Sequence, residues 1–177
     1  MLEPLTLVIG GARSGKSALA EGLIRQSPAQ PVYVATAEAH DDEMRARIAA
    51  HRAARGPGWR CVEAPHDPGA ALAQAGAHEA VLLDCATLWL TNRMLADDDL
   101  PAGIEALMAA LASCRAPVVV VSNEVGWSIV PENPLARRFR DAQGRLNQRL
   151  AAAAGLVVLV AAGLPLVLKG RLPEAGA

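Results

Sequence analysis

Short apolar runs alternate with segments of helical periodicity along most of the chain. The apolar runs predict strands at residues 5–9, 32–35, 80–83, 118–121, 156–160 and 164–168, with a short extended piece at 59–63. The helical patterns cover residues 17–25, 41–55, 100–113 and 134–154. Strands that alternate with helices predict an α/β fold, in which helices flank a mostly parallel sheet. Only an Ala-Ala-Gly turn separates the last two strands, so we expect them to form an antiparallel pair.

One stretch without charged residues, 150–168, reaches the length of about 18 apolar residues that a membrane span needs. Gly155, Gly163 and Pro165 interrupt this stretch, and Gly155 is a natural end for the preceding helix. β-branched runs separated by glycine are typical of buried strands, so we predict no membrane span. The first residues lack the basic start and long apolar core of a signal peptide, which favours a cytoplasmic protein.

The composition supports a buried core, with 52% hydrophobic and 20% charged residues among 177. We predict a single domain over residues 1–177. The formal net charge of −1 argues against a protein that coats nucleic acid, and the aromatic content of 3% leaves few platforms for base stacking. Cys61, Cys85 and Cys114 are widely spaced, which predicts reduced thiols rather than disulfides or a zinc site. The expected partner is therefore a small molecule and not a nucleic acid.

The segment between the first predicted strand and the first predicted helix fits the phosphate-loop motif G-x-x-x-x-G-K-[ST]. Its eight residues are Gly10, Gly11, Ala12, Arg13, Ser14, Gly15, Lys16 and Ser17. Glycines allow a tight turn whose N–H groups point at phosphate oxygens, and the start of the helix adds its positive dipole end. We expect Lys16 to reach the β- and γ-phosphates of a nucleoside triphosphate and the Ser17 hydroxyl to ligate Mg²⁺. The alternative is a glycine-rich turn that binds nothing.

A carboxylate at the end of a neighbouring strand usually completes the magnesium site of such a loop. Asp84 ends the predicted strand 80–83 and is the best placed candidate. The alternative for Asp84 is the N-cap of the helix that follows.

A histidine lies on a charged helical segment, 41–55. The helical period places Glu43, Arg47, His51 and Arg55 in one line. Guanidinium groups one turn either side favour a neutral, nucleophilic imidazole, and they could hold phosphate oxygens while a ring nitrogen attacks phosphorus. Spacing alone nevertheless favours the alternative, a solvated and salt-bridged face with an idle histidine.

Two later segments carry a more specific pattern. Asn-Glu-Val-Gly-Trp-Ser-Ile-Val-Pro-Glu-Asn occupies residues 123–133, and Gly-Arg-Leu-Asn-Gln occupies 144–148. Together with the phosphate loop and the Asp-Asp-Glu-Met start of the charged segment, these motifs closely resemble the bifunctional adenosylcobinamide kinase / adenosylcobinamide-phosphate guanylyltransferase family of cobalamin synthesis. The resemblance extends over about residues 5–169, and it implies a P-loop NTPase-type domain.

The resemblance implies two reactions. The first phosphorylates the hydroxyl of the aminopropanol arm of adenosylcobinamide with ATP or GTP. The second transfers GMP from GTP to that phosphate, which releases pyrophosphate and leaves adenosylcobinamide-GDP. The family forms a GMP–histidine intermediate, and His51 matches the position of that histidine. The resemblance therefore reverses the interpretation of His51 that spacing alone favours, and makes His51 and Lys16 the predicted catalytic residues.

Other features of the family carry over residue by residue. The resemblance predicts contacts with the nucleotide at Thr36, Ala37, Arg52, Ala53, Ala54, Arg55, Glu63 and Asp84. It implies a Mg²⁺ ion held by Ser17 and Asp84, and it implies a homotrimer. Glu124 and the arginines of 137–145 could hold the phosphate arm of the corrinoid or pyrophosphate. The alternative for those charged residues is ion pairing on the helix surface.

The chain also departs from the family pattern. Trp127 occupies a position where small residues are common, which could alter the approach of the corrinoid. Gly155 stands where an acidic residue is frequent, and Ala50 precedes His51 where some relatives have a second histidine. Two alternative functions stay open from the sequence, a monofunctional small-molecule P-loop kinase and a non-enzymatic GTP-sensing domain.

Overall fold

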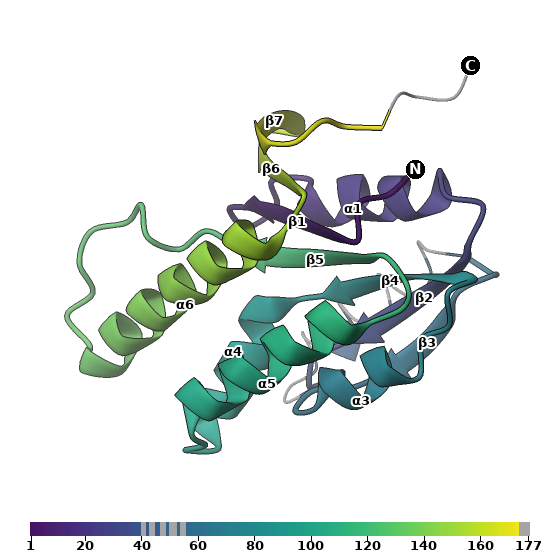
Figure 1. Ribbon diagram of the computed structural model, residues 1–177. Helices are drawn as coiled ribbons and strands as arrows, with labels where there is room; N and C mark the ends of the chain where they lie inside the picture. Colours follow the sequence, from purple (N-terminus) through teal and green to yellow (C-terminus); the bar gives the residue numbers. More distant parts are fainter. Residues whose placement is uncertain (40–41, 43–44, 47–48, 50–52, 54–55, 174–177) are drawn as a thin grey trace.

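The computed structural model describes residues 1–39, 42, 45–46, 49, 53 and 56–173 of the chain. A seven-stranded sheet forms its centre, with the strand order β3-β2-β4-β5-β1-β6-β7 (Figure 1). The strands are β1 (Leu5–Gly10), β2 (Gln30–Ala35), β3 (Arg60–Glu63), β4 (Glu79–Asp84), β5 (Val118–Asn123), β6 (Leu156–Ala161) and β7 (Leu164–Lys169). All neighbouring strands are parallel except β6 and β7, which form an antiparallel hairpin. The predicted parallel sheet with an antiparallel C-terminal pair is confirmed.

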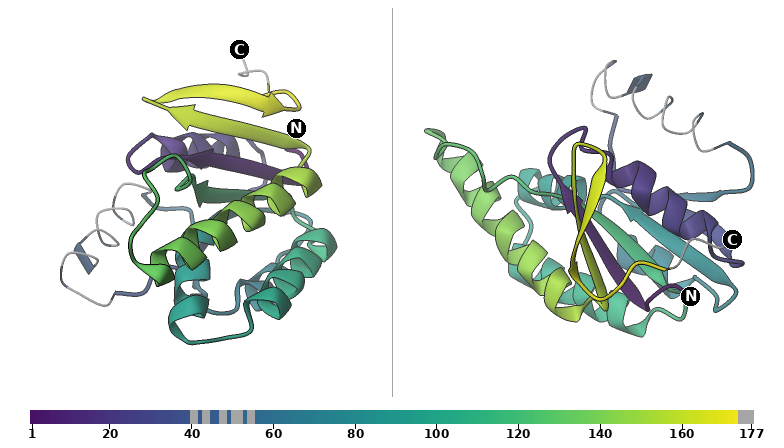
Figure 2. Two further views of the ribbon diagram at one scale, coloured as in Figure 1. Left: turned by 90° about the vertical axis from the view of Figure 1, so that its left-hand side faces the viewer. Right: turned by 90° about the horizontal axis from the view of Figure 1, so that it is seen from above.

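The described helices cover both faces of the sheet. They are α1 (Lys16–Arg25), α3 (Pro68–Ala73), α4 (Ala86–Leu95), α5 (Leu100–Ser113) and α6 (Pro134–Ala153). Helix α1 lies on one face, and α3, α4, α5 and α6 lie on the other (Figures 1 and 2). The central strands are therefore covered on both sides, which explains why they are mostly apolar.

Each face of the sheet has its own apolar cluster. Leu7 and Val120 pack with Leu90, Leu107 and other side chains of α3 to α6. On the opposite face, Val8, Val119 and Val121 pack with Ala20, Leu23 and Ile24 of α1. Successive residues of β5 thus contribute alternately to the two clusters, as the two-residue period of a strand requires.

The predicted strands and helices agree with the structure within a few residues at each end. The predicted helix 41–55 lies largely outside the described residues, although residues 42, 45–46, 49 and 53 are helical. Helix α4 has no predicted bounds and is expected only as the helix that follows Asp84. Helix α3 is absent from the sequence prediction, because its six residues Pro-Gly-Ala-Ala-Leu-Ala are too few to display a helical period. Its start is nevertheless well defined, since the Asp67 carboxylate accepts a hydrogen bond from the Ala70 N–H at 3.1 Å.

The uncharged stretch 150–168 is divided between the last turn of α6, strand β6 and strand β7. Among the residues that the structure describes, we find no helix with the length and apolarity needed to cross a membrane. A Cβ added to Gly155 would lie 2.5 Å from the Glu3 carboxylate. The Glu3 side chain therefore fills the space that a side chain at position 155 would need.

Glu79 gives a pH-dependent contribution to stability at the start of β4. One carboxylate oxygen accepts hydrogen bonds from the Arg60 guanidinium at 2.9 and 3.0 Å, and the other accepts one from the Gly76 N–H at 2.9 Å. The Gly76 hydrogen bond and, secondarily, Arg60 lower the pKa of Glu79. Because the folded-state pKa is depressed, this stabilisation is complete above the unfolded-state value and is lost as the pH falls through the folded-state value.

We expect Glu79→Gln to lower the free energy of unfolding by about 1–3 kcal/mol at pH 7, because the charged acceptor is lost. The gap from wild type should begin to narrow as the pH falls below the unfolded-state pKa of glutamate, about 4.3, and should close once the pH has passed the lowered folded-state pKa of Glu79. Urea denaturation at a series of pH values measures the difference in free energy of unfolding between the two proteins. A gap that stays constant down to pH 3 would show that the charge of Glu79 contributes nothing.

Candidate active site

The carboxyl ends of six parallel strands meet at one edge of the sheet. Register places Ala35 opposite both Glu63 and Asp84, and places Gly10 opposite Asn123. Segments far apart in the sequence thus contribute side chains to the same edge. In an open α/β sheet this edge is the usual place for a ligand.

The phosphate loop connects β1 to α1 at this edge. Arg13 and Gly15 have φ values of 56° and 96°, so both lie in the left-handed region that a tight turn requires. The loop is closed by a hydrogen bond from the Ser14 N–H to the Gly11 carbonyl at 3.3 Å. The Lys16 ammonium, which is largely buried, donates to the same carbonyl at 3.0 Å. In the part of the chain that the structure describes, no side chain caps the start of α1, so its first N–H groups are available to an anion.

The turn between β6 and β7 supports the phosphate loop from the side. The Gly163 N–H donates to the Ser14 carbonyl at 2.8 Å. A Cβ on Gly15 would lie 3.2 Å from the Gly163 Cα, and one on Gly10 would lie 2.5 Å from the Val160 carbonyl oxygen. The glycines of the motif are therefore required by the close approach of this hairpin as well as by the backbone turn.

We expect Gly10→Ala to lower the free energy of unfolding by about 1–3 kcal/mol, because the new methyl group would overlap the Val160 carbonyl and the Ser14 hydroxyl. Gly11→Ala is the matched control, since a Cβ there meets nothing within 4 Å and should change stability by no more than about 0.5 kcal/mol. Denaturant unfolding of both variants measures the difference. Equal effects at the two positions would contradict the steric explanation.

Thr36 and Cys85 hold the end of β4. The Thr36 hydroxyl accepts from the Cys85 N–H at 2.8 Å and donates to the Cys85 carbonyl at 2.7 Å. The N-cap of α4 is Cys85, whose Sγ accepts a hydrogen bond from the Leu88 N–H at 3.4 Å. The alternative interpretation of Asp84 as the N-cap is therefore wrong, because α4 begins one residue later. Thr36 acts on the backbone beside Asp84, and its predicted contact with the nucleotide stays a prediction.

The Cys85 thiol does not act as a nucleophile at this edge of the sheet. Burial, followed by the charge of Asp84, raises the pKa of the Cys85 thiol to about 11. Cys85 therefore stays protonated near neutral pH. All three cysteines are free, in agreement with the prediction of reduced thiols.

The donors that could hold Mg²⁺ are oxygens. Ser17 is the second residue of α1 and Asp84 is the last residue of β4, and both side chains are half-buried. A hydroxyl, a carboxylate and the oxygens of a bound triphosphate match the preference of Mg²⁺ for few protein ligands. Within the described part of the chain no three His, Cys, Asp or Glu side chains are grouped to hold a metal by themselves. Ser17 and Asp84 as magnesium ligands stay a prediction.

Only some of the remaining predicted nucleotide residues lie in the part of the chain that the structure describes. Ala37 is half-buried just after Thr36, while Glu63 ends β3 and Ala53 is exposed. His51, Arg52, Ala54 and Arg55 lie outside the described residues. The nucleotide contacts of all these residues stay predictions.

The segment after β5 begins beside the phosphate loop. The Glu124 N–H donates to the Gly10 carbonyl at 3.0 Å, and the Glu124 carboxylate accepts from the Gly126 N–H at 2.7 Å. Arg137 donates to the carbonyls of Pro131 and Glu132 at 2.9 and 2.6 Å. These contacts stabilise local backbone, so the suggested role of Glu124 and the arginines toward a phosphate arm stays a prediction.

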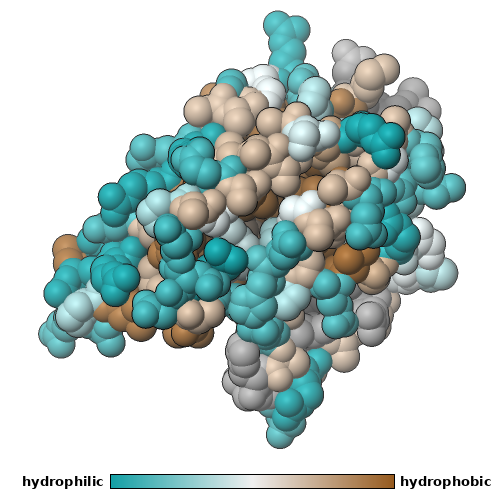
Figure 3. All heavy atoms as spheres, turned by 60° about the horizontal axis from the view of Figure 1, so that its bottom comes forward, coloured by the Kyte–Doolittle hydropathy of each residue, from teal (hydrophilic) through white to brown (hydrophobic). Residues whose placement is uncertain are grey.

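Exposed apolar side chains follow on the same segment. Trp127, Ile129 and Val130 are 79%, 93% and 61% exposed, and Leu135 is 44% exposed at the start of α6. Apolar surface is visible at the left-hand end of the molecule in Figure 3, where α6 begins. An exposed apolar group of this kind usually marks a surface that contacts a ligand or another protein.

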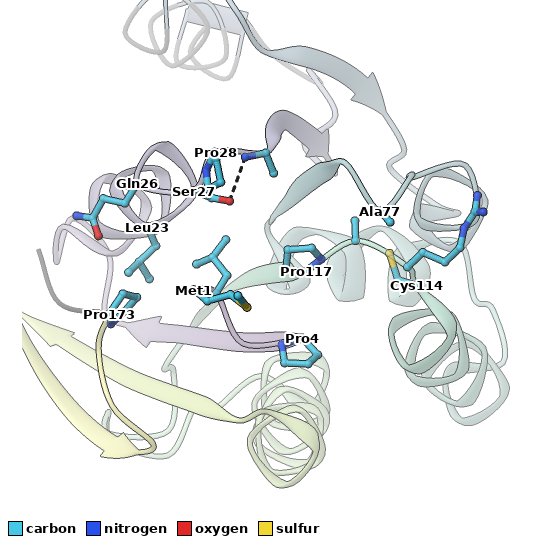
Figure 4. A pocket seen from close by; sticks show the side chains of 14 residues that line it. Met1, Pro4, Leu23, Gln26, Ser27, Pro28, Ala77, Cys114, Pro117 and Pro173 are labelled. Atoms are coloured by element: carbon cyan, nitrogen blue, oxygen red, sulfur yellow. Dashed lines mark hydrogen bonds between the residues drawn. The ribbon is translucent and has the colours of Figure 1, made fainter. Parts of the chain in front are cut away.

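A pocket of about 430 Å³ lies at the opposite, amino-terminal edge of the sheet (Figure 4). Its lining comes from the segments that precede β1, β2, β4 and β5, and includes Pro4, Ser27, Ala77 and Pro117. The phosphate loop and Asp84 are at the other ends of these strands. This pocket therefore takes no part in the candidate active site.

One group of site residues was missed by reasoning from the sequence. Thr87, Ser122, Gln143 and Asn147 form a buried polar network behind the end of β5. Gln143 and Asn147 are four residues apart on the buried face of α6, which they share with Leu146 and Leu150. Two amides on the buried face of an amphipathic helix are the signal that could have revealed the network.

The strand, glycine loop and helix at the carboxyl edge of a parallel sheet define the class of P-loop NTPase folds. Among solved structures, an ATPase from the type III secretion system of pathogenic bacteria is similar, with a TM-score of 0.55 and 12% sequence identity. The similarity covers 92% of this chain and 56% of that chain. At this identity the comparison supports the fold alone.

The sequence comparisons are more specific. The family model described as "Cobinamide kinase / cobinamide phosphate guanyltransferase" matches residues 6–168. The "Bifunctional adenosylcobalamin biosynthesis protein CobP" of Pseudomonas aeruginosa is 46% identical over 168 residues, which cover 93% of this chain and 97% of that protein. The "Bifunctional adenosylcobalamin biosynthesis protein CobU" of Escherichia coli K12 is 46% identical over 93% of this chain and 99% of its own. The chain belongs to this family of enzymes, which confirms the resemblance.

Proposed function

We propose that this chain phosphorylates adenosylcobinamide with ATP or GTP and then transfers GMP from GTP to the phosphate formed. The products are adenosylcobinamide-GDP and pyrophosphate, and one domain over residues 1–177 performs both steps. The observation that carries the proposal is the phosphate loop, with its left-handed turn and buried Lys16, in a chain of the cobinamide kinase and guanyltransferase family. The names of the relatives from P. aeruginosa and E. coli support the same pathway.

In the kinase step, the hydroxyl oxygen of the aminopropanol arm attacks the γ-phosphorus and its proton is released to solvent. The bond from the γ-phosphorus to the β-phosphate oxygen breaks, and a nucleoside diphosphate leaves. The loop N–H groups and the start of α1 hold the phosphates, while the Lys16 ammonium exchanges the Gly11 carbonyl for β- and γ-phosphate oxygens. Ser17 and Asp84 would hold Mg²⁺, which when bound neutralises part of the phosphate charge.

In the guanylyl step, a ring nitrogen of His51 attacks the α-phosphorus of GTP and pyrophosphate leaves. A phosphate oxygen of adenosylcobinamide phosphate then attacks the same phosphorus, and the phosphorus–nitrogen bond breaks. Two displacements let GTP and the corrinoid bind one after the other. The assignment of His51 rests on the family resemblance, because His51 lies outside the described residues.

Incubation with α-labelled GTP and Mg²⁺, without corrinoid, tests the guanylyl step. We expect label on the protein that is labile to acid and stable to base, as a phosphorus–nitrogen bond is, together with one pyrophosphate per labelled chain. Adenosylcobinamide phosphate should then remove the label as adenosylcobinamide-GDP. If no label forms and no pyrophosphate is released, while a γ-labelled nucleotide still phosphorylates adenosylcobinamide, the chain is a monofunctional kinase. Nucleotide binding without either reaction would indicate a GTP-sensing domain.

The proposal includes a homotrimer, carried over from the family. Exposed apolar residues support association of the chain with itself, since Leu164, Leu166 and Leu168 of the edge strand β7 are 72%, 58% and 54% exposed. We place the enzyme in the cytoplasm, where its nucleotide substrates are and where its three free thiols persist. Sedimentation equilibrium at micromolar concentration measures the oligomeric state.

A further inference from the structure

A buried network of four polar side chains lies behind the end of β5. Thr87 comes from the first turn of α4, Ser122 from β5, and Gln143 and Asn147 from successive turns of α6. Ser122 and Gln143 are fully buried, and Thr87 and Asn147 are 6% and 7% exposed. Burying four polar side chains is costly unless they bond one another, so their arrangement needs an explanation.

The Ser122 hydroxyl is at the centre of the network. It donates to the Asn147 Oδ1 at 2.6 Å and accepts from the Gln143 Nε2 at 2.9 Å. The Gln143 Nε2 also donates to the Asn147 Oδ1 at 2.9 Å, and the hydroxyls of Thr87 and Ser122 are 3.5 Å apart. A single set of proton positions satisfies all these contacts, with the Thr87 hydroxyl donating to Ser122.

The network ends on the backbone of Asn123. The Asn123 N–H donates to the Thr87 Oγ1 at 2.7 Å, and the Asn147 Nδ2 donates to the Asn123 carbonyl at 3.0 Å. These two backbone groups point toward β4, but β4 ends at Asp84, which is opposite Val121. The chain turns into α4 before it can provide a partner strand for Asn123. Thr87 and Asn147 therefore replace the missing strand, and they extend β5 past its neighbour.

The other side of the same residue faces the phosphate loop. Asn123 is opposite Gly10 in the register of β1 and β5, and the Glu124 N–H bonds to the Gly10 carbonyl at 3.0 Å. The Asn123 side chain shares a face with Val121, which packs in the cluster around α1. The end of β5 is thus held between the network on one side and the first residue of the phosphate loop on the other.

We propose that Thr87, Ser122, Gln143 and Asn147 are positioning residues for the nucleotide site. They hold Asn123 and Glu124 against Gly10. Because Gly10 is the first residue of the phosphate loop, they set the geometry of that loop through the end of β5. An apolar core at these positions would fill the same space but would leave the Asn123 peptide groups without partners. For catalysis, this inference rests on the proposed phosphorylation of adenosylcobinamide.

Thr87→Val tests the proposal, because valine keeps the shape of threonine and removes the hydroxyl. Thr87→Ser keeps the hydroxyl and is the conservative rescue. Thr6→Val is the matched control, since Thr6 is a fully buried threonine of β1 whose hydroxyl has no hydrogen-bond partner among the described residues. The three variants separate the loss of this hydroxyl from the general effect of a threonine-to-valine change in the core.

The first measurement is the rate of the kinase step. We expect Thr87→Val to lower kcat by about 10- to 100-fold while KM for the nucleotide changes by less than about threefold, because misplacement of the loop acts on the transition state. Thr87→Ser and Thr6→Val should stay within about threefold of wild type. A kcat of Thr87→Val equal to that of Thr6→Val would overturn the proposal, and would leave the network a purely structural one.

The second measurement does not need the kinase reaction. Amide hydrogen exchange is followed at Asn123 and Glu124 with Mg²⁺ and the β,γ-imido analogue of GTP. In wild type and Thr87→Ser, the analogue should slow exchange at Glu124, and in Thr87→Val this slowing should be lost while the amide of Val120 is unchanged. If wild type proves inactive as a kinase, the proposed function fails, and exchange at Glu124 still decides the positioning role. Unchanged slowing in Thr87→Val overturns it.

Discussion

Lys16→Ala should lower the kcat/KM for phosphorylation of adenosylcobinamide by at least about 10²- to 10³-fold. The ammonium is the nearest fixed positive charge to the phosphates in the proposed complex, and removing one such donor from a preorganised site typically has an effect of this size. In the structure Lys16 is held in place by the Gly11 carbonyl at 3.0 Å, so the charge is directed into the loop before any nucleotide binds. Transfer of label from a γ-labelled nucleotide to the corrinoid measures the rate.

Lys169→Ala is the matched control, because Lys16 and Lys169 are the only lysines of the chain. The Lys169 ammonium donates to the carbonyls of Ala151 and Ala152 at 3.1 and 3.0 Å, at the end of α6. Its removal should lower the free energy of unfolding by no more than about 1 kcal/mol and leave the kinase rate within about twofold of wild type. A Lys16→Ala enzyme with more than about a tenth of the wild-type rate would mean that another group provides the charge.

His51→Ala should abolish labelling of the protein by α-labelled GTP, a loss of about 10³-fold or more down to background. Removing the nucleophile of a covalent mechanism eliminates the intermediate itself, so no partial effect is expected. Kinase turnover should remain within about fivefold of wild type, because attack at the γ-phosphorus does not use the imidazole. Gel autoradiography after acid and base treatment measures the label, and pyrophosphate release measures the reaction.

His78→Ala is the control for the histidine substitution. His78 is exposed just before β4, at the amino-terminal edge of the sheet, far in the fold from the carboxyl edge that holds the phosphate loop. It should keep both reactions at wild-type rates. Persistent label in His51→Ala would assign the nucleophile to another residue, whereas loss of both reactions in His51→Ala would point to a structural role for His51.

The order of the strands explains why part of the site could be predicted and part could not. Asp84 ends an apolar run and is easily recognised as an acidic residue at a strand end. The sheet order then places β5 between β4 and β1, so the neighbours of Gly10 are Asn123 of β5 and Val160 of β6, and not a residue of β4. Nothing in the local pattern of β4 or β5 indicates this order, because each is an apolar run that ends in a polar residue at its carboxyl end.

The N-cap of α4 and the buried polar network also could not be predicted from the sequence. Asp84 and Cys85 are adjacent and either could precede α4, and the structure assigns the cap to Cys85 because the Thr36 hydroxyl holds its backbone. Ser122 and Asn147 are 25 residues apart in the sequence, and they meet only when α6 packs on the sheet. The sequence motifs that contain Ser122 and Asn147 could be recognised, but the contact between the two residues could not be predicted.

By itself, the sequence determined the alternation of strands and helices, the position of the phosphate loop and the family. These features are local, because burial on both faces makes a strand apolar over its length, and a phosphate loop is formed by eight consecutive residues. Only the tertiary structure decided which strands are neighbours, how the Gly163 turn supports Ser14, and how Thr87 and Asn147 complete the end of β5. Those contacts join residues that are distant along the chain, and the packing of helices on the sheet brings them together.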